Sequence, residues 1–229
     1  MLLSIIVPAY NEEKTIALLI EKVKAVALPG TMRKEIIIVN DGSKDKTADV
    51  LKQFEGDATI KIFHKENGGK TSALVRGMQE ATGDIILIQD ADLEYDPAQY
   101  PQLLDPILKG EREVVYGSRF MGTIADMQPI NRIANVASNA TFTLLWGTKI
   151  TDINTCYKVF TKEALKGITI TTRNFAFETE VTVKILKKGI KIKEIPIKYT
   201  ARSRQAGKKI NWRTALEMYW PIIKYRFKS

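Results

Sequence analysis

The chain has 229 residues, of which 45% are hydrophobic and 27% are charged, a composition typical of a folded protein rather than a disordered one. Its one cysteine, Cys156, and its one histidine, His64, exclude a disulfide framework, a Cys-x-x-Cys metal site and any centre that needs two histidines. The formal net charge is +9, yet residues 184–229 alone carry 14 lysines and arginines against Glu194 and Glu217. This asymmetry predicts an anionic partner for the C-terminal fifth of the chain.

Apolar runs alternate with helical patterns through the first half of the chain. Strands are expected at Ser4–Pro8, Glu35–Asn40, Ile60–His64, Asp84–Gln89 and Val114–Gly117. Helices are expected between them at Glu12–Ala27, Thr47–Phe54 and Thr71–Ala81. Because continuous β-branched strands that alternate with helices form parallel sheets covered on both faces, the predicted fold class is α/β with a mostly parallel, Rossmann-like sheet.

The second half of the chain is richer in helical patterns. Helices are expected at Arg132–Trp146, Phe177–Lys187 and Trp212–Tyr225, and a strand at Ile192–Tyr199. No linker, repeat or low-complexity tract interrupts the chain, so residues 1–229 are predicted to form a single domain. The sequence has no run of 18 apolar residues and no signal-peptide pattern at its start, so we expect no spanning segment and a cytoplasmic location.

Polar residues follow three of the predicted strands, at residues 8–12, 40–43 and 89–92. Ligands of open parallel sheets bind beyond the carboxyl ends of the strands, so these segments are predicted to converge on one crevice. The sharpest of them contains Asp90 and Asp92, followed by Glu94. Carboxylates two residues apart in an extended segment face the same side and can share a hard divalent cation suited to diphosphate oxygens. The simpler interpretation is that each segment is a turn that caps a helix.

Other nucleotide-binding motifs are missing. The sequence contains neither GxxxxGK[ST] nor GxGxxG, which disfavours a P-loop and a dinucleotide site. It also lacks the aromatic pattern of an RNA-recognition motif and a zinc finger, so no nucleic-acid partner is expected despite the basic C-terminal end.

Seven segments together resemble the family 2 glycosyltransferases. They are Ser4–Glu13, Ile37–Thr47, Asn67–Gly77, Gly83–Pro97, Gly117–Phe120, Thr151–Phe160 and Ile192–Ile210. The last three narrow the resemblance, and the whole is similar to the dolichyl- and polyprenyl-phosphate sugar synthase branch. The resemblance implies a GT-A fold, a nucleotide-sugar donor, Mg²⁺ or Mn²⁺, and inversion at the anomeric carbon. It divides the chain into a nucleotide-binding half, residues 1–117, and an acceptor-binding half, residues 118–229.

The resemblance also assigns roles to individual residues on the donor side. The nucleotide-sugar residues would be Pro8, Tyr10, Glu12, Asp41, Lys70, Asp90, Ala91, Asp92, Arg202 and Lys208. The metal ligands would be Asp90, Asp92 and Glu94. Position 94 is commonly glutamine in the synthase branch, so Glu94 adds negative charge to the metal site. The basic segment from Arg202 to Lys209 would close over the donor diphosphate, although a solvated loop is the simpler interpretation.

On the acceptor side, Arg119 and Arg132 would bind the phosphate of a polyprenyl or dolichyl phosphate. Asp92, Asp152 and Arg119 are the predicted catalytic residues, and Asp152 would act as a base or orient the acceptor. The function predicted is transfer of a hexose from GDP-mannose or UDP-glucose to the lipid phosphate. The alternative is a family 2 enzyme with a hydroxyl acceptor, for which Asp152 would be the essential base.

Two amphipathic segments raise the question of a membrane. Residues 121–146 and 212–227 combine apolar or aromatic side chains with nearby basic residues. Such helices suit the surface of an anionic membrane, which predicts peripheral attachment to the cytoplasmic face of a membrane. Packing into the protein core is the equally open alternative.

Overall fold

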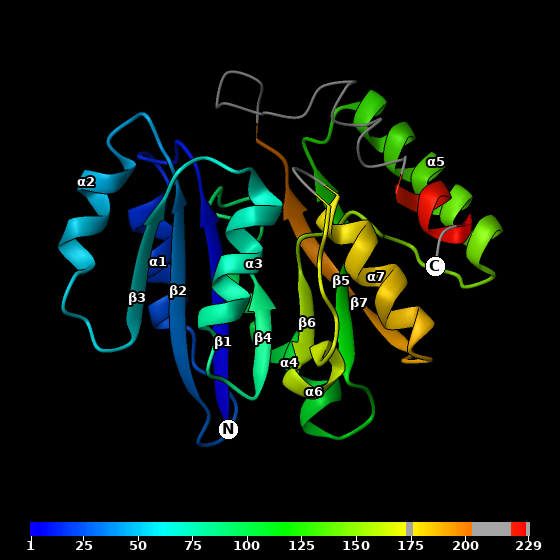
Figure 1. Ribbon diagram of the computed structural model, residues 1–229, viewed down its shortest axis with the longest axis horizontal. Coiled ribbons are helices and arrows are strands. Elements are labelled where there is room, and N and C mark those ends of the chain that lie inside the picture. The colour runs from blue at the N-terminus through cyan, green and yellow to red at the C-terminus, as the bar shows by residue number, and fades with distance from the viewer. Residues whose placement is uncertain (173–175, 203–220, 228–229) are drawn as a thin grey trace.

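The computed structural model describes residues 1–172, 176–202 and 221–227. Its centre is a seven-stranded sheet in the order β3-β2-β1-β4-β6-β5-β7, with helices on both sides (Figure 1). The pairs β1–β2, β1–β4, β2–β3 and β5–β7 are parallel, and β6 runs antiparallel to both of its neighbours. The predicted α/β class with a mostly parallel sheet is therefore confirmed.

The first half follows the predicted alternation of strands and helices. Its elements are β1 (Leu2–Ala9), α1 (Ile16–Ala25), β2 (Arg33–Asp41), α2 (Thr47–Leu51), η1 (Lys52–Phe54), β3 (Ile60–Lys65), α3 (Lys70–Glu80) and β4 (Ile85–Ile88). The four residues at the start of the predicted helix Glu12–Ala27 form a turn instead, after Asn11 takes a positive φ of 54°. The helix periodicity itself holds, because Ile16, Leu19, Ile20 and Val23 are all buried.

The second half contains elements that the sequence patterns did not indicate. Its elements are η2 (Pro97–Gln99), α4 (Tyr100–Leu108), β5 (Val114–Ala125), α5 (Pro129–Trp146), β6 (Lys158–Thr161), α6 (Lys162–Leu165), α7 (Phe177–Lys187) and β7 (Ile192–Thr200). The unpredicted α4 contains Pro101 and Pro106, and two prolines in nine residues are typical of a loop rather than a helix. The unpredicted β6 has four residues, one of them a lysine, which is too little for a strand pattern. Of the predicted helix Trp212–Tyr225, residues 212–220 lie outside the described residues, and 221–227 are helical.

Close packing fixes the positions of the helices and the outer strands. The α3 helix crosses β1 at Gly77, where a Cβ atom would lie 2.4 Å from Cγ2 of Ile6. Towards the β7 edge of the sheet, β5 extends well beyond its predicted end. Gly122 allows this, because its backbone lies so close to Ile197 of β7 that any Cβ atom there would collide. In Figure 1 α3 and α7 lie in front of the sheet and α1 behind it.

The carboxyl ends of β1, β2, β4 and β7 meet at one edge of the sheet, because these strands run in the same direction. This carboxyl edge, at the top of Figure 1, holds the polar segments singled out from the sequence. The α5 helix lies at the periphery, and Trp146 at its end donates a hydrogen bond to the Ile222 carbonyl at 3.2 Å. No described helix combines the length and apolar character required to cross a membrane.

Candidate active site

The two aspartates after β4 lie at the centre of the carboxyl edge. Asp90 is paired with Lys70, whose Nζ lies 2.8 Å from Oδ1 of Asp90. The same Nζ lies 3.0 Å from Oε1 of Glu178 on α7. Burial would lower the pKa of Lys70, but the charges of Asp90 and Glu178 hold it well above its usual value. Lys70 is therefore a fixed cation that joins α3, the end of β4 and α7.

Arg202 joins the second aspartate to the end of β1. Its Nη1 lies 2.9 Å from Oε2 of Glu12, and its Nη2 lies 3.3 Å from Oδ2 of Asp92. Burial, together with the charges of Asp90 and Glu94, raises the pKa of Asp92 to about 7, even though Arg202 acts in the opposite direction. Arg202 therefore links the ends of β1 and β4 through Glu12 and Asp92.

The carboxylate of Glu94 is held by residues at and just after the end of β7. Its Oε1 accepts a hydrogen bond from the Arg202 backbone N–H at 2.7 Å, and its Oε2 accepts one from the Tyr199 hydroxyl. Within the described part of the chain, no group of three or more His, Cys, Asp or Glu side chains is arranged to hold a metal ion. The predicted set of three ligands is thus not assembled here, although Asp90 and Asp92 lie at the predicted place.

Asp41 is buried at the end of β2 and organises the neighbouring loop. Its carboxylate accepts hydrogen bonds from the backbone N–H groups of Gly68 at 3.0 Å and Gly69 at 2.8 Å, and from Lys65 at 2.7 Å. The side chain of Asn67 donates to the Asp41 carbonyl at 2.9 Å. Asp41 therefore holds the loop that leads into α3 and so positions Lys70.

The remaining predicted donor residues fall into two groups. At the carboxyl end of β1, Pro8 and Tyr10 are half-buried, and Ala91 is buried between the two aspartates. Lys208 lies outside the described residues, as does the rest of the predicted basic loop beyond Arg202. Their predicted contacts with a nucleotide sugar stay predictions.

Arg119 and Asp152, which the sequence presented as two separate candidates, form one buried ion pair. Nε of Arg119 lies 2.7 Å from Oδ2 of Asp152, and Nη2 lies 2.7 Å from Oδ1. The Arg119 backbone N–H also donates to Oδ2 at 2.9 Å. Asp152 has no exposed surface, and Arg119 is 6% exposed. Both carboxylate oxygens of Asp152 are thus engaged by the arginine.

A second layer holds this pair in place. Glu194 on β7 accepts hydrogen bonds from the backbone N–H groups of Thr151 and Asp152 at 2.8 and 3.0 Å. The Arg119 guanidinium stacks over the Tyr199 ring at 5.1 Å and donates to Oδ1 of Asn135 on α5 at 3.3 Å. By contrast, Arg132, the other predicted phosphate ligand, is an exposed residue of α5.

Sequence reasoning missed the ionisable residues beneath this region. Lys158 on β6 is fully buried, donates to the Ile153 carbonyl at 2.9 Å and lies 3.6 Å from the centre of the Tyr116 ring. Burial lowers its pKa to about 7, although Glu178, Asp152 and Glu194 act in the opposite direction. A lysine within a short apolar run was the available signal. The sequence contained no comparable signal for Glu194, because this residue occupies a polar position of a strand with alternating apolar and polar residues.

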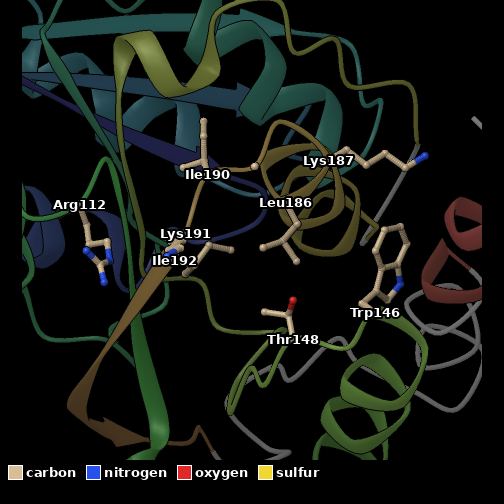
Figure 2. Close-up of a pocket in the computed structure, with 9 residues that line it drawn as sticks. Arg112, Trp146, Thr148, Leu186, Lys187, Ile190, Lys191 and Ile192 are labelled. Carbon is tan, nitrogen blue, oxygen red and sulfur yellow. The ribbon is translucent and has the colours of Figure 1, made fainter.

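A separate cavity of about 450 Å³ lies at the opposite end of β7 (Figure 2). Its walls include Trp146, Leu186, Lys187, Lys191 and Ile192. Ile192 is the first residue of β7, whereas Glu94 and Arg202 meet at the other end of that strand. The cavity is therefore distinct from the carboxyl-edge site.

Comparison with known proteins identifies the family and the fold. The model of glycosyl transferase family 2 matches residues 4–169. UDP-N-acetylglucosamine–dolichyl-phosphate N-acetylglucosaminyltransferase of Methanococcus voltae is 31% identical, over 90% of this chain and 89% of the relative. Dolichol-phosphate mannosyltransferase of Pyrococcus furiosus is 29% identical, over 91% of this chain and 59% of the relative. Glycosyltransferase AglJ of Haloferax volcanii is 29% identical, over 86% of this chain and 63% of the relative.

The chain belongs to glycosyl transferase family 2. It spans less than two thirds of the length of the mannosyltransferase and of AglJ. Its fold is also that of glucosyl-3-phosphoglycerate synthase from Mycobacterium tuberculosis, solved with Mn²⁺, UDP and phosphoglyceric acid. The two structures superpose with a TM-score of 0.76 at 17% identity, over 98% of this chain and 78% of the synthase. The predicted GT-A-type fold is confirmed.

Proposed function

We propose that this protein transfers a hexose from a nucleotide sugar to a polyprenyl or dolichyl phosphate, with Mg²⁺ or Mn²⁺ as cofactor. Two relatives whose names specify a dolichyl-phosphate or dolichol-phosphate acceptor support the acceptor class. The synthase that shares the fold was solved with Mn²⁺ and UDP, which is consistent with the donor class and the metal. The donor's base and sugar are left open between the UDP and GDP types.

The donor side of the site fits a hard divalent cation. Its donors are carboxylate oxygens, which Mg²⁺ and Mn²⁺ prefer, and Asp90 and Asp92 follow β4 at the carboxyl edge. Asp90 and Asp92 would hold the metal, while Glu94 accepts hydrogen bonds from Tyr199 and the Arg202 backbone. When bound, the metal would offset the charge that develops on the departing diphosphate. Lys70 and Arg202 supply further positive charge beside the same aspartates.

The observation that carries the proposal is the buried ion pair between Asp152 and Arg119. A hydroxyl acceptor must lose a proton to a base, whereas a lipid phosphate is already an anion and can attack without one. Asp152 is fully buried and bound at both oxygens, so it is not positioned to accept a proton. Catalysis with a phosphate acceptor needs positioning and stabilisation of charge, which Arg119, Lys70 and Arg202 are suited to provide.

The acceptor side also offers a surface for lipid. The α5 stripe, composed of Ile130, Ile133, Val136 and Leu144, is 50 to 84% exposed. The helix buries only Ser138, Asn139 and Phe142, and it carries the exposed Arg132. An apolar stripe with cationic neighbours suits the surface of an anionic membrane. We propose that this stripe lies against the membrane and brings the lipid phosphate toward Arg119.

The acceptor proposal is tested with a matched pair of lipids. Transfer of radiolabelled sugar from UDP-glucose, UDP-N-acetylglucosamine or GDP-mannose is measured with polyprenyl phosphate and with the dephosphorylated polyprenol, in Mg²⁺ or Mn²⁺. We expect product with the phosphate alone, and none with the Asp92→Asn variant. Transfer to the polyprenol or to a saccharide hydroxyl, without transfer to the phosphate, would establish the hydroxyl-acceptor alternative.

The membrane proposal is tested by cosedimentation with vesicles that contain phosphatidylglycerol. The double variant Ile133→Ser/Leu144→Ser should bind several times more weakly than the unaltered protein. The control is Leu18→Ser, which removes a 52% exposed leucine from α1. Equal binding by all three proteins would show that the α5 stripe is not the membrane contact.

A further inference from the structure

Glu178 is a buried carboxylate, and the protein supplies a partner for only one of its two oxygens. It is the second residue of α7 and is 5% exposed. Its Oε1 pairs with Lys70 at 3.0 Å, but its Oε2 is buried and has no hydrogen-bond partner. A buried oxygen of a charged group without a partner costs free energy, so native proteins rarely retain one.

The neighbouring Glu180 shows that this segment can fully satisfy a buried carboxylate. Glu180 has no exposed surface, and it accepts hydrogen bonds from the backbone N–H groups of Thr171 and Thr172, from their hydroxyls and from Lys184. Hydrogen bonds from Lys184 and Thr172 outweigh its burial and lower its pKa to about 2. Two carboxylates on one helix thus differ sharply, and the unsatisfied one is next to the active site.

The order of the strands places Glu178 between the donor and acceptor residues. Lys70 bridges Glu178 to Asp90 at the end of β4, and the Cys156 thiol, just before β6, is close enough that the charges of Asp90 and Glu178 affect its pKa. The predicted nucleotide residues that follow β1, β2 and β4 lie on one side of β6, and Arg119 on β5 lies on the other side, whereas Arg202 follows β7. In a transferase the reacting sugar occupies the position between the diphosphate and the acceptor.

We propose that Oε2 of Glu178 accepts a hydrogen bond from a hydroxyl of the donor's sugar and so helps to determine which sugar is transferred. This inference rests on the proposed function, because it presupposes a nucleotide-sugar donor. A sugar hydroxyl is a neutral donor that can satisfy the remaining oxygen while Lys70 stays paired with the other. A site built to hydrogen-bond a substrate hydroxyl discriminates strongly against analogues that lack it.

The test separates binding of the sugar from binding of the diphosphate. Affinities for UDP, UDP-glucose, GDP and GDP-mannose are measured by titration calorimetry with Mg²⁺ for the unaltered protein and for Glu178→Gln, Glu178→Asp and Glu180→Gln. For whichever nucleotide binds, Glu178→Gln should lower affinity for the nucleotide sugar at least about tenfold and change affinity for the bare diphosphate less than about threefold. Glu178→Asp keeps the charge but moves the carboxylate oxygens away from the sugar, because its side chain is shorter. It should therefore show the same loss of affinity for the nucleotide sugar and not for the bare diphosphate. Glu180→Gln, the control for removing a buried charge from α7, should leave the ratio of the two affinities unchanged.

Each result has a distinct meaning. Equal losses for the diphosphate and the nucleotide sugar, or no loss for either, would overturn the role of Glu178 and leave the proposed function intact. If the unaltered protein binds none of the four nucleotides, the proposed function fails and the role of Glu178 fails with it. Deoxy analogues of the bound sugar add a further check, because the analogue that lacks the relevant hydroxyl should bind the unaltered protein and Glu178→Gln equally.

Discussion

The Asp152→Asn substitution tests whether this residue holds Arg119 in place. It removes the charge from a carboxylate with no exposed surface that makes three contacts of 2.7 to 2.9 Å with Arg119. The guanidinium would stay buried without its counter-charge, and breaking such a pair costs about 3 to 5 kcal/mol. We therefore expect the free energy of unfolding, measured by urea denaturation at pH 7, to fall by about that amount.

The matched control is Asp105→Asn, which breaks the exposed pair between Asp105 on α4 and Lys109, the residue that follows this helix. Exposed pairs of this kind contribute little because water screens them, so the control should lose only a small fraction of the stability lost by Asp152→Asn. If the two substitutions cost the same, the interpretation of Asp152 as a buried positioning residue is refuted.

Three further predictions concern the sheet and the metal site. Hydrogen bonds from Lys61, Ser4 and Thr82 outweigh burial and lower the pKa of Glu35 to about 2, so its contribution is complete above pH 5 and is lost as the pH falls toward 2. Urea denaturation should show an acid-dependent loss of roughly 3 kcal/mol that Glu35→Gln lacks, and parallel pH curves would contradict this. Gly77→Ala should destabilise the protein by about 1 to 3 kcal/mol, because its Cβ would press on β1, and an unchanged melting temperature would count against that packing. Asp92→Asn should lower kcat at least about 100-fold at saturating Mg²⁺ without unfolding the protein, as circular dichroism can verify, and near-normal turnover would exclude Asp92 as a metal ligand.

Local sequence patterns correctly predicted the elements whose buried face is visible in the spacing of their own apolar residues. The strands β1, β2 and β4 each contain a continuous apolar run, and the spacing of Ile16, Leu19 and Ile20 matched the buried face of α1. The place of Asp90 and Asp92 could be predicted because a parallel sheet brings its carboxyl ends together. The family resemblance then extended these expectations to the fold as a whole.

Contacts between distant segments could not be read from local patterns. Arg119 and Asp152 are 33 positions apart, and they meet only because β6 turns back between β4 and β5. Lys70 and Glu178 meet only because α3 and α7 both reach the end of β4. The division of the chain into a donor and an acceptor half stays a prediction, as does the role of the basic segment beyond Arg202.

The central claim is that the acceptor is an anion and needs no protein base. The most direct measurement is kcat/KM for transfer to polyprenyl phosphate between pH 6 and 9 at saturating Mg²⁺. The second ionisation of a phosphate monoester lies near pH 6, so we expect the rate to rise to about pH 7 and then stay level. A further rise across the alkaline range, or transfer that proceeds with the polyprenol but not with the phosphate, would contradict the account.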